Sequence, residues 1–146
     1  MWPFSKKEKD EAEIVKKEVM GEILLNQAPM FFMDDGEYTR LSESKAKAFI
    51  RKAHRLRSSG KEYRKETLDC DDFVIQARSD VVDEQILQAF DAPFAFGSVY
   101  FARKNGERHV MNMTILKDGR PMFYEPQDRT FTFSLPEGAV IERVQF

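Results

Sequence analysis

The sequence has few of the residues that build disulfide frameworks and metal centres. Its 146 residues include one cysteine and two histidines. A single cysteine excludes an internal disulfide and fits a reducing compartment, so we expect a cytoplasmic protein. Cys-x-x-Cys and His-x-x-x-His spacings do not occur, so the sequence predicts neither a metal site nor a bound cofactor.

Long apolar runs are also missing. No stretch approaches the roughly 18 apolar residues of a membrane span, and the start of the chain is charged where a signal peptide would be apolar. A content of 42% hydrophobic and 33% charged residues, with a net charge of −2, is ordinary for a globular domain. The thirteen phenylalanines predict an aromatic-rich core.

The pattern along the chain predicts two units. Residues 1–27 are expected to contain an amphipathic helix, either packed on the domain or peripheral to it. Residues 28–146 are expected to form one domain, with helices over 42–90 and a sheet over 94–146. Helices followed by strands predict an α+β fold, in which the helices pack on a C-terminal antiparallel sheet of about five strands.

Two surface features have functional alternatives that we do not favour. Trp2 and Phe4 could touch a membrane, but the acidic residues that follow would be repelled by an anionic surface. The segment 40–65 holds ten basic residues against two acids and could contact phosphates. A solvated helix face is the preferred interpretation, with His54 solvated on it, so we do not expect nucleic acid as a partner.

The single cysteine lies at a predicted helix start. Asp69 is a good N-cap, which places Cys70 at the first helical position. Val74, Ala77 and Val81 follow at helical spacing and carry the cysteine toward the core. A helix N-terminus stabilises a thiolate and is a common place for a nucleophile. The alternative is an inert core cysteine, the usual fate of a lone cysteine.

Two hairpins follow, and the second decides what can orient a histidine. Turns are predicted at 104–107 and 117–120, with His109 at the start of the strand between them. If the second loop has two residues, His109 faces Asp128 and Glu125 points to the other face. If it has three, His109 faces Gln127 and Glu125 joins the face of His109. The sequence leaves the three candidates open.

The motifs Asp69-Cys70-Asp71-Asp72-Phe73, His109 with Asn112, and Tyr124-Glu125-Pro126-Gln127 together resemble the bacterial and phage transglutaminase-like cysteine peptidases. These belong with the papain-like hydrolases, and the resemblance covers about half of the chain. It implies a papain-like fold with Cys70 as nucleophile, His109 as base and Glu125 as the orienting group, with Gln127 and Asp128 as alternates. The oxyanion would be held by the backbone N–H of Cys70 and one upstream donor, for which Tyr63 or Arg64 is a candidate.

The resulting prediction is a cysteine hydrolase or acyl-transferase that acts on an amide bond of a peptide or cell-wall peptide. The alternative is an inactive binding module of the same fold for a protein or cell-wall ligand. A zinc site at Cys70, His109 and neighbouring aspartates is less favoured. The sequence does not indicate the substrate or the oligomeric state.

Overall fold

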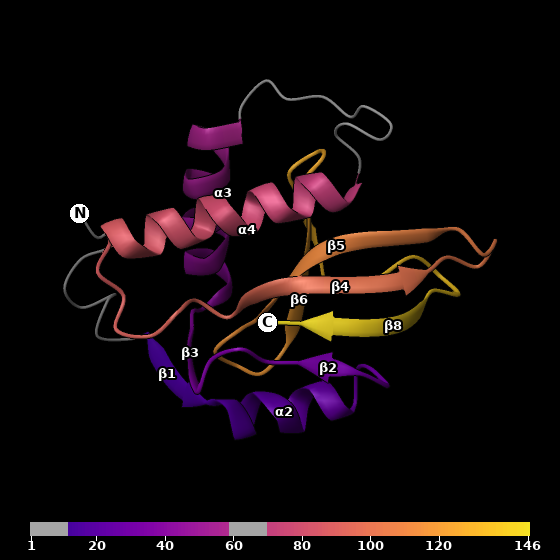
Figure 1. Cartoon of the computed structure of the whole chain (residues 1–146), viewed down its shortest axis with the longest axis horizontal. Coiled ribbons are helices and arrows are strands. Elements are labelled where there is room, and N and C mark those ends of the chain that lie inside the picture. The colour runs from indigo at the N-terminus through magenta and orange to yellow at the C-terminus, as the bar shows by residue number, and fades with distance from the viewer. Residues whose placement is uncertain (1–11, 59–69) are drawn as a thin grey trace.

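The structure is a computed structural model that describes residues 12–58 and 70–146. These residues form eight strands and three helices (Figure 1). In chain order the elements are β1 (Glu13–Lys16), α2 (Lys17–Leu25), β2 (Phe31–Phe32), β3 (Glu37–Arg40), α3 (Glu43–Ser58), α4 (Cys70–Leu87), β4 (Phe96–Ala102), β5 (Arg108–Ile115), β6 (Pro121–Glu125), β7 (Thr130–Thr132) and β8 (Val140–Gln145).

The main sheet has six strands in the order β2-β8-β4-β5-β6-β7, and β1 pairs with β3 in a separate two-stranded sheet. Neighbours in the main sheet are antiparallel except β2 and β8, which are parallel. The predicted α+β fold, with N-terminal helices on a C-terminal antiparallel sheet of about five strands, is therefore wrong. The fold is richer in strands, and a strand from the N-terminal part joins the sheet edge.

The missed strands are short, and their pairing partners are distant in the sequence. Strand β2 has two residues and pairs with Val144 and Gln145 of β8. Two residues carry no alternation of apolar and polar side chains, so periodicity could not predict this strand. Its residues become a strand only because the edge of the sheet offers them backbone partners.

The N-terminal part differs in detail from the single long helix that the sequence pattern suggested. Strand β1 pairs with β3, with Val15 opposite Tyr38, and helix α2 follows directly. Met20 and Leu24 of α2 are fully buried, so this helix belongs to the core. Trp2 and Phe4 lie outside the described residues, so the membrane contact, which the sequence did not favour, is not tested. Among the described helices, none has the length and hydrophobicity to cross a membrane.

Helices α3 and α4 pack on one face of the sheet, while α2 lies on the other side (Figure 1). On α3, Phe49 and Ile50 are fully buried. On α4, the predicted inward stripe is confirmed at Val74, Ala77 and Val81. Helix α4 runs unbroken from Cys70 to Leu87.

In the described part of the basic segment 40–65, three basic side chains form ion pairs. Nη2 of Arg40 lies 2.9 Å from a carboxylate oxygen of Glu13. Nζ of Lys47 lies 2.9 Å from a carboxylate oxygen of Glu43, and Nζ of Lys52 lies 3.9 Å from one of Glu84. His54 was expected to be solvated, and this is wrong, because it is 1% exposed. Its Nδ1 atom lies 2.5 Å from the Tyr124 hydroxyl.

Both predicted hairpins are confirmed, and both have three-residue loops. In the first, the Arg103 N–H donates to the Glu107 carbonyl. In the second, the Leu116 N–H donates to the Arg120 carbonyl. The last loop residue is a glycine with a φ of +89° in each case, which a residue with a Cβ rarely adopts.

Candidate functional site

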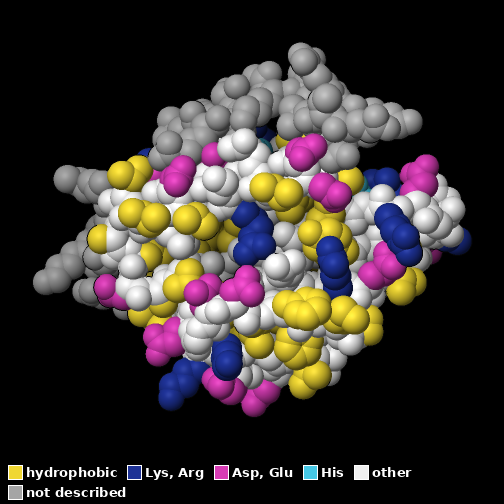
Figure 2. All heavy atoms as spheres, in the orientation of Figure 1, with side chains coloured by type: hydrophobic (Ala, Val, Ile, Leu, Met, Phe, Trp, Pro, Cys, Tyr) yellow, Lys and Arg dark blue, Asp and Glu magenta, His cyan; other side chains and the backbone are white. Residues whose placement is uncertain are grey.

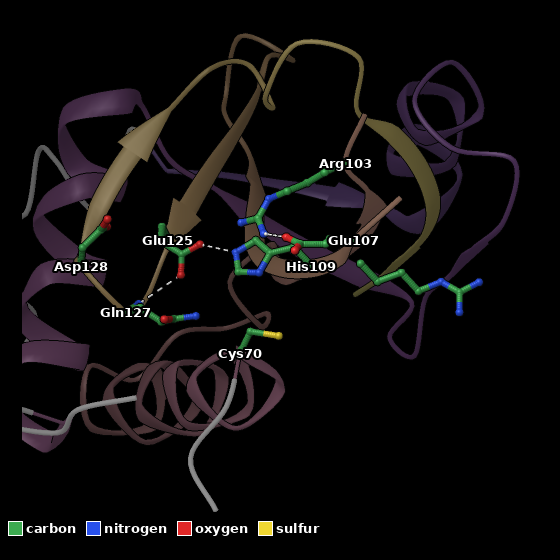
Figure 3. Close-up of a pocket in the computed structure, with 8 residues that line it drawn as sticks. Cys70, Arg103, Glu107, His109, Glu125, Gln127 and Asp128 are labelled. Carbon is green, nitrogen blue, oxygen red and sulfur yellow. Dashed lines mark hydrogen bonds and ion pairs between the residues drawn. The ribbon is translucent and has the colours of Figure 1, made fainter. Parts of the chain in front are cut away.

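A cavity of about 580 Å³ opens where the N-terminus of α4 meets the ends of β5 and β6 (Figure 3). Three of its lining residues are Cys70, His109 and Glu125, which the sequence analysis combined into one site. The full lining consists of Cys70, Arg103, Glu107, Arg108, His109, Glu125, Gln127 and Asp128. The structure thus brings residues from a helix and two hairpins to one place.

The register between β5 and β6 decides which acid meets the histidine. Asn112 pairs with Tyr124, and Met113 pairs with Phe123. This is the register of the three-residue loop, and it places Glu125 on the same face as His109. A register shifted by one residue would turn Glu125 to the opposite face.

His109 and Glu125 form a short, shielded pair. Nε2 of His109 lies 2.6 Å from Oε2 of Glu125, and the two side chains are only 10% and 16% exposed. The His109 ring also packs edge-on against Phe101, with centroids 5.5 Å apart. A carboxylate on one ring nitrogen fixes the orientation of an imidazole and leaves the other nitrogen for a second partner. Nδ1 of His109 has no hydrogen-bond partner among the described residues.

The two alternates, Gln127 and Asp128, line the cavity but have other roles in the structure. The backbone N–H of Gln127 donates to Oε1 of Glu125 over 3.3 Å and so holds the second oxygen of that carboxylate. Asp128 instead accepts hydrogen bonds from the backbone and hydroxyl of Thr130. Of the three candidates, Glu125 is the one in contact with the imidazole.

Cys70 is the first residue of α4 and is partly buried. In Figure 3 its side chain lies on the helix side of the cavity, below the His109 ring. Its sulfur is 4.0 Å from Oδ1 of Asp71, so an acid of the first helical turn lies beside the thiol. A negative charge there opposes a thiolate, while the free N–H groups of the helix start favour it.

Asn112 fixes α4 against the sheet close to this site. Its side-chain amide is fully buried and donates to the carbonyls of Val74, at 3.3 Å, and Gly97, at 3.2 Å. Val74 lies one helical turn beyond Cys70, and Asn112 lies three residues beyond His109 on β5. The bonds to this one side chain therefore help set the position of the thiol relative to the imidazole.

Some predicted features stay untested. Tyr63 and Arg64, the candidates for the second oxyanion donor, lie outside the described residues, as does Asp69. In the ranges 12–58 and 70–146, no cluster of three or more His, Cys, Asp or Glu side chains is arranged to hold a metal ion.

Sequence reasoning missed the arginines and acids at the mouth of the cavity. Arg103 lies 3.5 Å from Glu107 across the first hairpin, and Arg108 lies 3.1 Å from Glu142 of β8. The signal was available for Arg103 and Glu107, because both flank the predicted Asn105-Gly106 turn next to His109. No such signal was available for the contact of Arg108 with β8, since that contact depends on the order of strands in the sheet.

Comparison with known proteins assigns the chain to a family. Residues 38–131 match the family described as Agglutinin C-terminal, and this match spans more than half of the chain. The chain belongs to this family of agglutinin domains. No curated protein matches it.

Two solved structures share the fold. One is titled "PSL1a-E64 complex", with a TM-score of 0.75 and 21% identity over 91% of this chain and 51% of that chain. The other is Polyporus squamosus lectin bound to the human-type influenza-binding epitope Neu5Aca2-6Galb1-4GlcNAc, with a TM-score of 0.70 and 19% identity over 91% of this chain and 49% of that one. The chain thus spans about half the length of these proteins.

These findings correct the family prediction. The identification as a transglutaminase-like cysteine peptidase of the papain-like hydrolases is wrong, because the chain belongs to the agglutinin C-terminal family and shares its fold with a lectin structure. The three matching motifs are short, and short motifs do not fix a family. The predicted binding module fits the agglutinin family better than the predicted cysteine hydrolase does.

Proposed function

We propose that this agglutinin-family domain binds a ligand in the cavity at the start of α4, and that Cys70 forms a covalent bond with an electrophilic carbon of that ligand. The observation that carries the proposal is the His109–Glu125 pair, 2.6 Å apart, in the same cavity as the cysteine. A thiol, an imidazole and an orienting carboxylate are the parts that nucleophilic catalysis by cysteine requires.

Each residue has a defined role in this proposal. Nδ1 of His109 takes the thiol proton, Nε2 remains bound to Glu125, and the Cys70 sulfur attacks the carbonyl carbon of an amide. The oxygen of that carbonyl becomes an oxyanion, which the backbone N–H of Cys70 can stabilise at the helix start. When the carbonyl re-forms, the C–N bond breaks, and the leaving amine receives the proton from His109. The acyl group then passes from sulfur to an acceptor.

The test is the rate at which Cys70 is alkylated by iodoacetamide, read by intact mass, since the chain has one cysteine. At pH about 6.5 we expect a faster rate than for free cysteine, whose thiol is mostly protonated there because its pKa is about 8.5. His109→Ala should remove the advantage, and Glu125→Gln should reduce it by freeing the ring.

Glu137→Gln provides the matched control, because Glu137 is exposed and does not line the cavity. It should react as the unsubstituted protein does. A Cys70 rate no faster than that of free cysteine, unchanged by either site variant, would show that the thiol is not activated.

Non-covalent glycan binding in the same cavity is the second candidate. It is favoured by the agglutinin family and by the sugar-bound lectin structure, although the chain spans only about half of that lectin. Arginine, glutamine and carboxylate side chains line the cavity and can hydrogen-bond hydroxyl groups. Titration of Cys70→Ser with the epitope named above tests it. Saturable shifts of cavity amides in NMR spectra, together with ordinary thiol reactivity of the unsubstituted protein, would favour this candidate.

A further inference from the structure

A second cavity, of about 320 Å³, adjoins the first and shares Cys70, Arg108 and His109 with it. The groove therefore continues on both sides of the cysteine and histidine. The remaining residues of the second cavity are Asp71, Tyr100, Val110, Glu142 and Arg143. Two of them, Glu142 and Arg143, come from β8, a strand that the sequence analysis did not connect with the site.

A β-bulge brings two consecutive residues of β8 to this cavity. Tyr100 pairs with Arg143, but the next residue, Phe101, pairs with Ile141, so Glu142 has no partner on β4. Consecutive residues of a regular strand point to opposite faces, and a bulge changes that alternation. Here both Glu142 and Arg143 line the cavity.

Glu142 and Arg143 make different contacts. Glu142 is paired with Arg108 at 3.1 Å, so its charge is already compensated. Arg143 is exposed, and its guanidinium lies 4.0 Å above the Tyr100 ring. Among the described residues, no carboxylate lies within ion-pair distance of Arg143. Stacking fixes the plane of a guanidinium while leaving its N–H groups free to donate.

The surrounding surface does not provide a general attraction for anions. Figure 2 shows basic and acidic side chains scattered among hydrophobic ones over the face that it presents. Asp71 at the start of α4 also lines the second cavity and opposes a nearby anion. Selection of a negatively charged ligand group must therefore come from a specific contact, and Arg143 supplies the geometry for one.

We propose that Arg143, stacked on Tyr100, is a carboxylate-binding subsite that selects ligands with an acidic group beside the carbon attacked by Cys70. This proposal rests on the proposed function of the cavity. A planar guanidinium binds a carboxylate through two parallel N–H···O bonds, which gives both orientation and strength. The ligand class is a peptide or acyl amino acid that carries a side-chain or terminal carboxylate.

The test uses three bromoacetyl reagents that alkylate cysteine, with the C–S bond forming as bromide leaves. Bromoacetyl-glutamate α-amide carries a side-chain carboxylate, bromoacetyl-glutamine carries a terminal carboxylate, and bromoacetyl-glutamine amide carries neither. We expect at least one acidic reagent to label Cys70 about tenfold faster than the neutral one, the size of one charge-assisted contact. The faster of the two acidic reagents identifies the source of the carboxylate.

Arg143→Met should abolish that preference, so that the acidic reagents label Cys70 no faster than the neutral reagent does. Arg120→Met is the matched control. Arg120 also stacks on an aromatic ring, 4.5 Å from Phe133, but it pairs with Asp118 at 2.8 Å and Glu43 at 3.3 Å, and it lines neither cavity. This control should keep the preference.

The outcomes separate the two proposals. Equal rates for all reagents, all faster than with free cysteine, would reject the subsite and support the activated thiol. If Cys70 reacts no faster than free cysteine, a binding measurement still tests the subsite. In it, acetyl-glutamate amide and acetyl-glutamine amide are each titrated into Cys70→Ser, and binding is monitored by NMR. A preference for the acidic compound that Arg143→Met removes supports the subsite, and equal binding of both compounds overturns it.

Discussion

The two faces of the six-stranded sheet are built from different kinds of residue. On the side of α2, the core is a continuous hydrophobic cluster that includes Met20, Leu24, Phe101 and Met113, all fully buried. On the side of α3 and α4, the hydrophobic cluster around Phe49 lies among buried polar side chains. These polar side chains are His54, Asp80, Glu84, Gln88, Ser98, Asn112 and Thr114.

The difference follows the alternation along β5. Met111 and Met113 point toward the side of α2, while Asn112 and Thr114 point toward the side of α3 and α4. Asp80 and Glu84 are four residues apart on α4, so they lie on one stripe of that helix, and Gln88 follows directly after its last residue. Buried polar groups need partners, and those partners fix the helices in one position.

This comparison shows how the site is held in place. Apolar packing behind the sheet supports the His109 ring through Phe101. Polar contacts on the helix side set the position of α4 and therefore of Cys70. The hydrophobic face should thus contribute most to stability, and the polar face most to the geometry of the site.

The largest expected effect is on the hydrophobic face. Phe101→Ala should lower the free energy of unfolding by about 3–5 kcal/mol, because it leaves a cavity under β4 and β5. Urea unfolding followed by circular dichroism measures it. Phe133→Ala is the control, since Phe133 is 41% exposed, and it should cost less than about 1 kcal/mol. Equal losses in the two variants would contradict a core centred on Phe101.

A smaller effect is expected from the polar face. Asn112→Ala should lower the free energy of unfolding by about 1–3 kcal/mol, because the contacts to Val74 and Gly97 are lost. It should also slow the alkylation of Cys70, since α4 is no longer held at its first turns.

The control for Asn112 is two residues away on the same face. The Thr114 hydroxyl is buried and has no hydrogen-bond partner among the described residues. Thr114→Val removes it and keeps the shape, so stability should stay within about 0.5 kcal/mol or rise. If Thr114→Val loses as much stability as Asn112→Ala, the hydrogen bonds of Asn112 are not the reason for the loss.

The smallest expected effect is the change in stability per pH unit above pH 10. It compares one buried tyrosine from each side of the six-stranded sheet. Burial raises the pKa of Tyr124 well above its ordinary value of 10.0, and burial also raises the pKa of Tyr38. Above pH 10 the unfolded chain loses these protons while the folded chain keeps them. The stabilisation is therefore complete below pH 10 and falls as pH rises, by at most about 1.4 kcal/mol per pH unit for each group.

Urea unfolding at several pH values above 10 measures this slope. Tyr124→Phe and Tyr38→Phe should each reduce it, and the effect of Tyr124 should persist to higher pH because its shift is the larger one. Tyr124→Phe should also lower stability at neutral pH, since it leaves Nδ1 of His54 without the hydroxyl. An alkaline slope that neither substitution changes would assign the effect to other groups.

Local patterns in the sequence determined several parts of this protein. The apolar stripe of α4, the helix start at Cys70 and the two glycine-containing hairpins follow from spacing and turn residues within short segments. The sequence also limited the partner of His109 to three candidates. These features depend on interactions between residues close in the chain, which is why sequence reasoning could reach them.

Only the tertiary structure decided the rest. The addition of β2 beside β8, the burial of His54 and the bulge that places both Glu142 and Arg143 at the second cavity depend on contacts between distant segments. The choice of Glu125 depended on the register of one hairpin, and a shift of one residue would exchange the faces of every side chain in it. The turn residues alone allowed either register, and the packed sheet permits one.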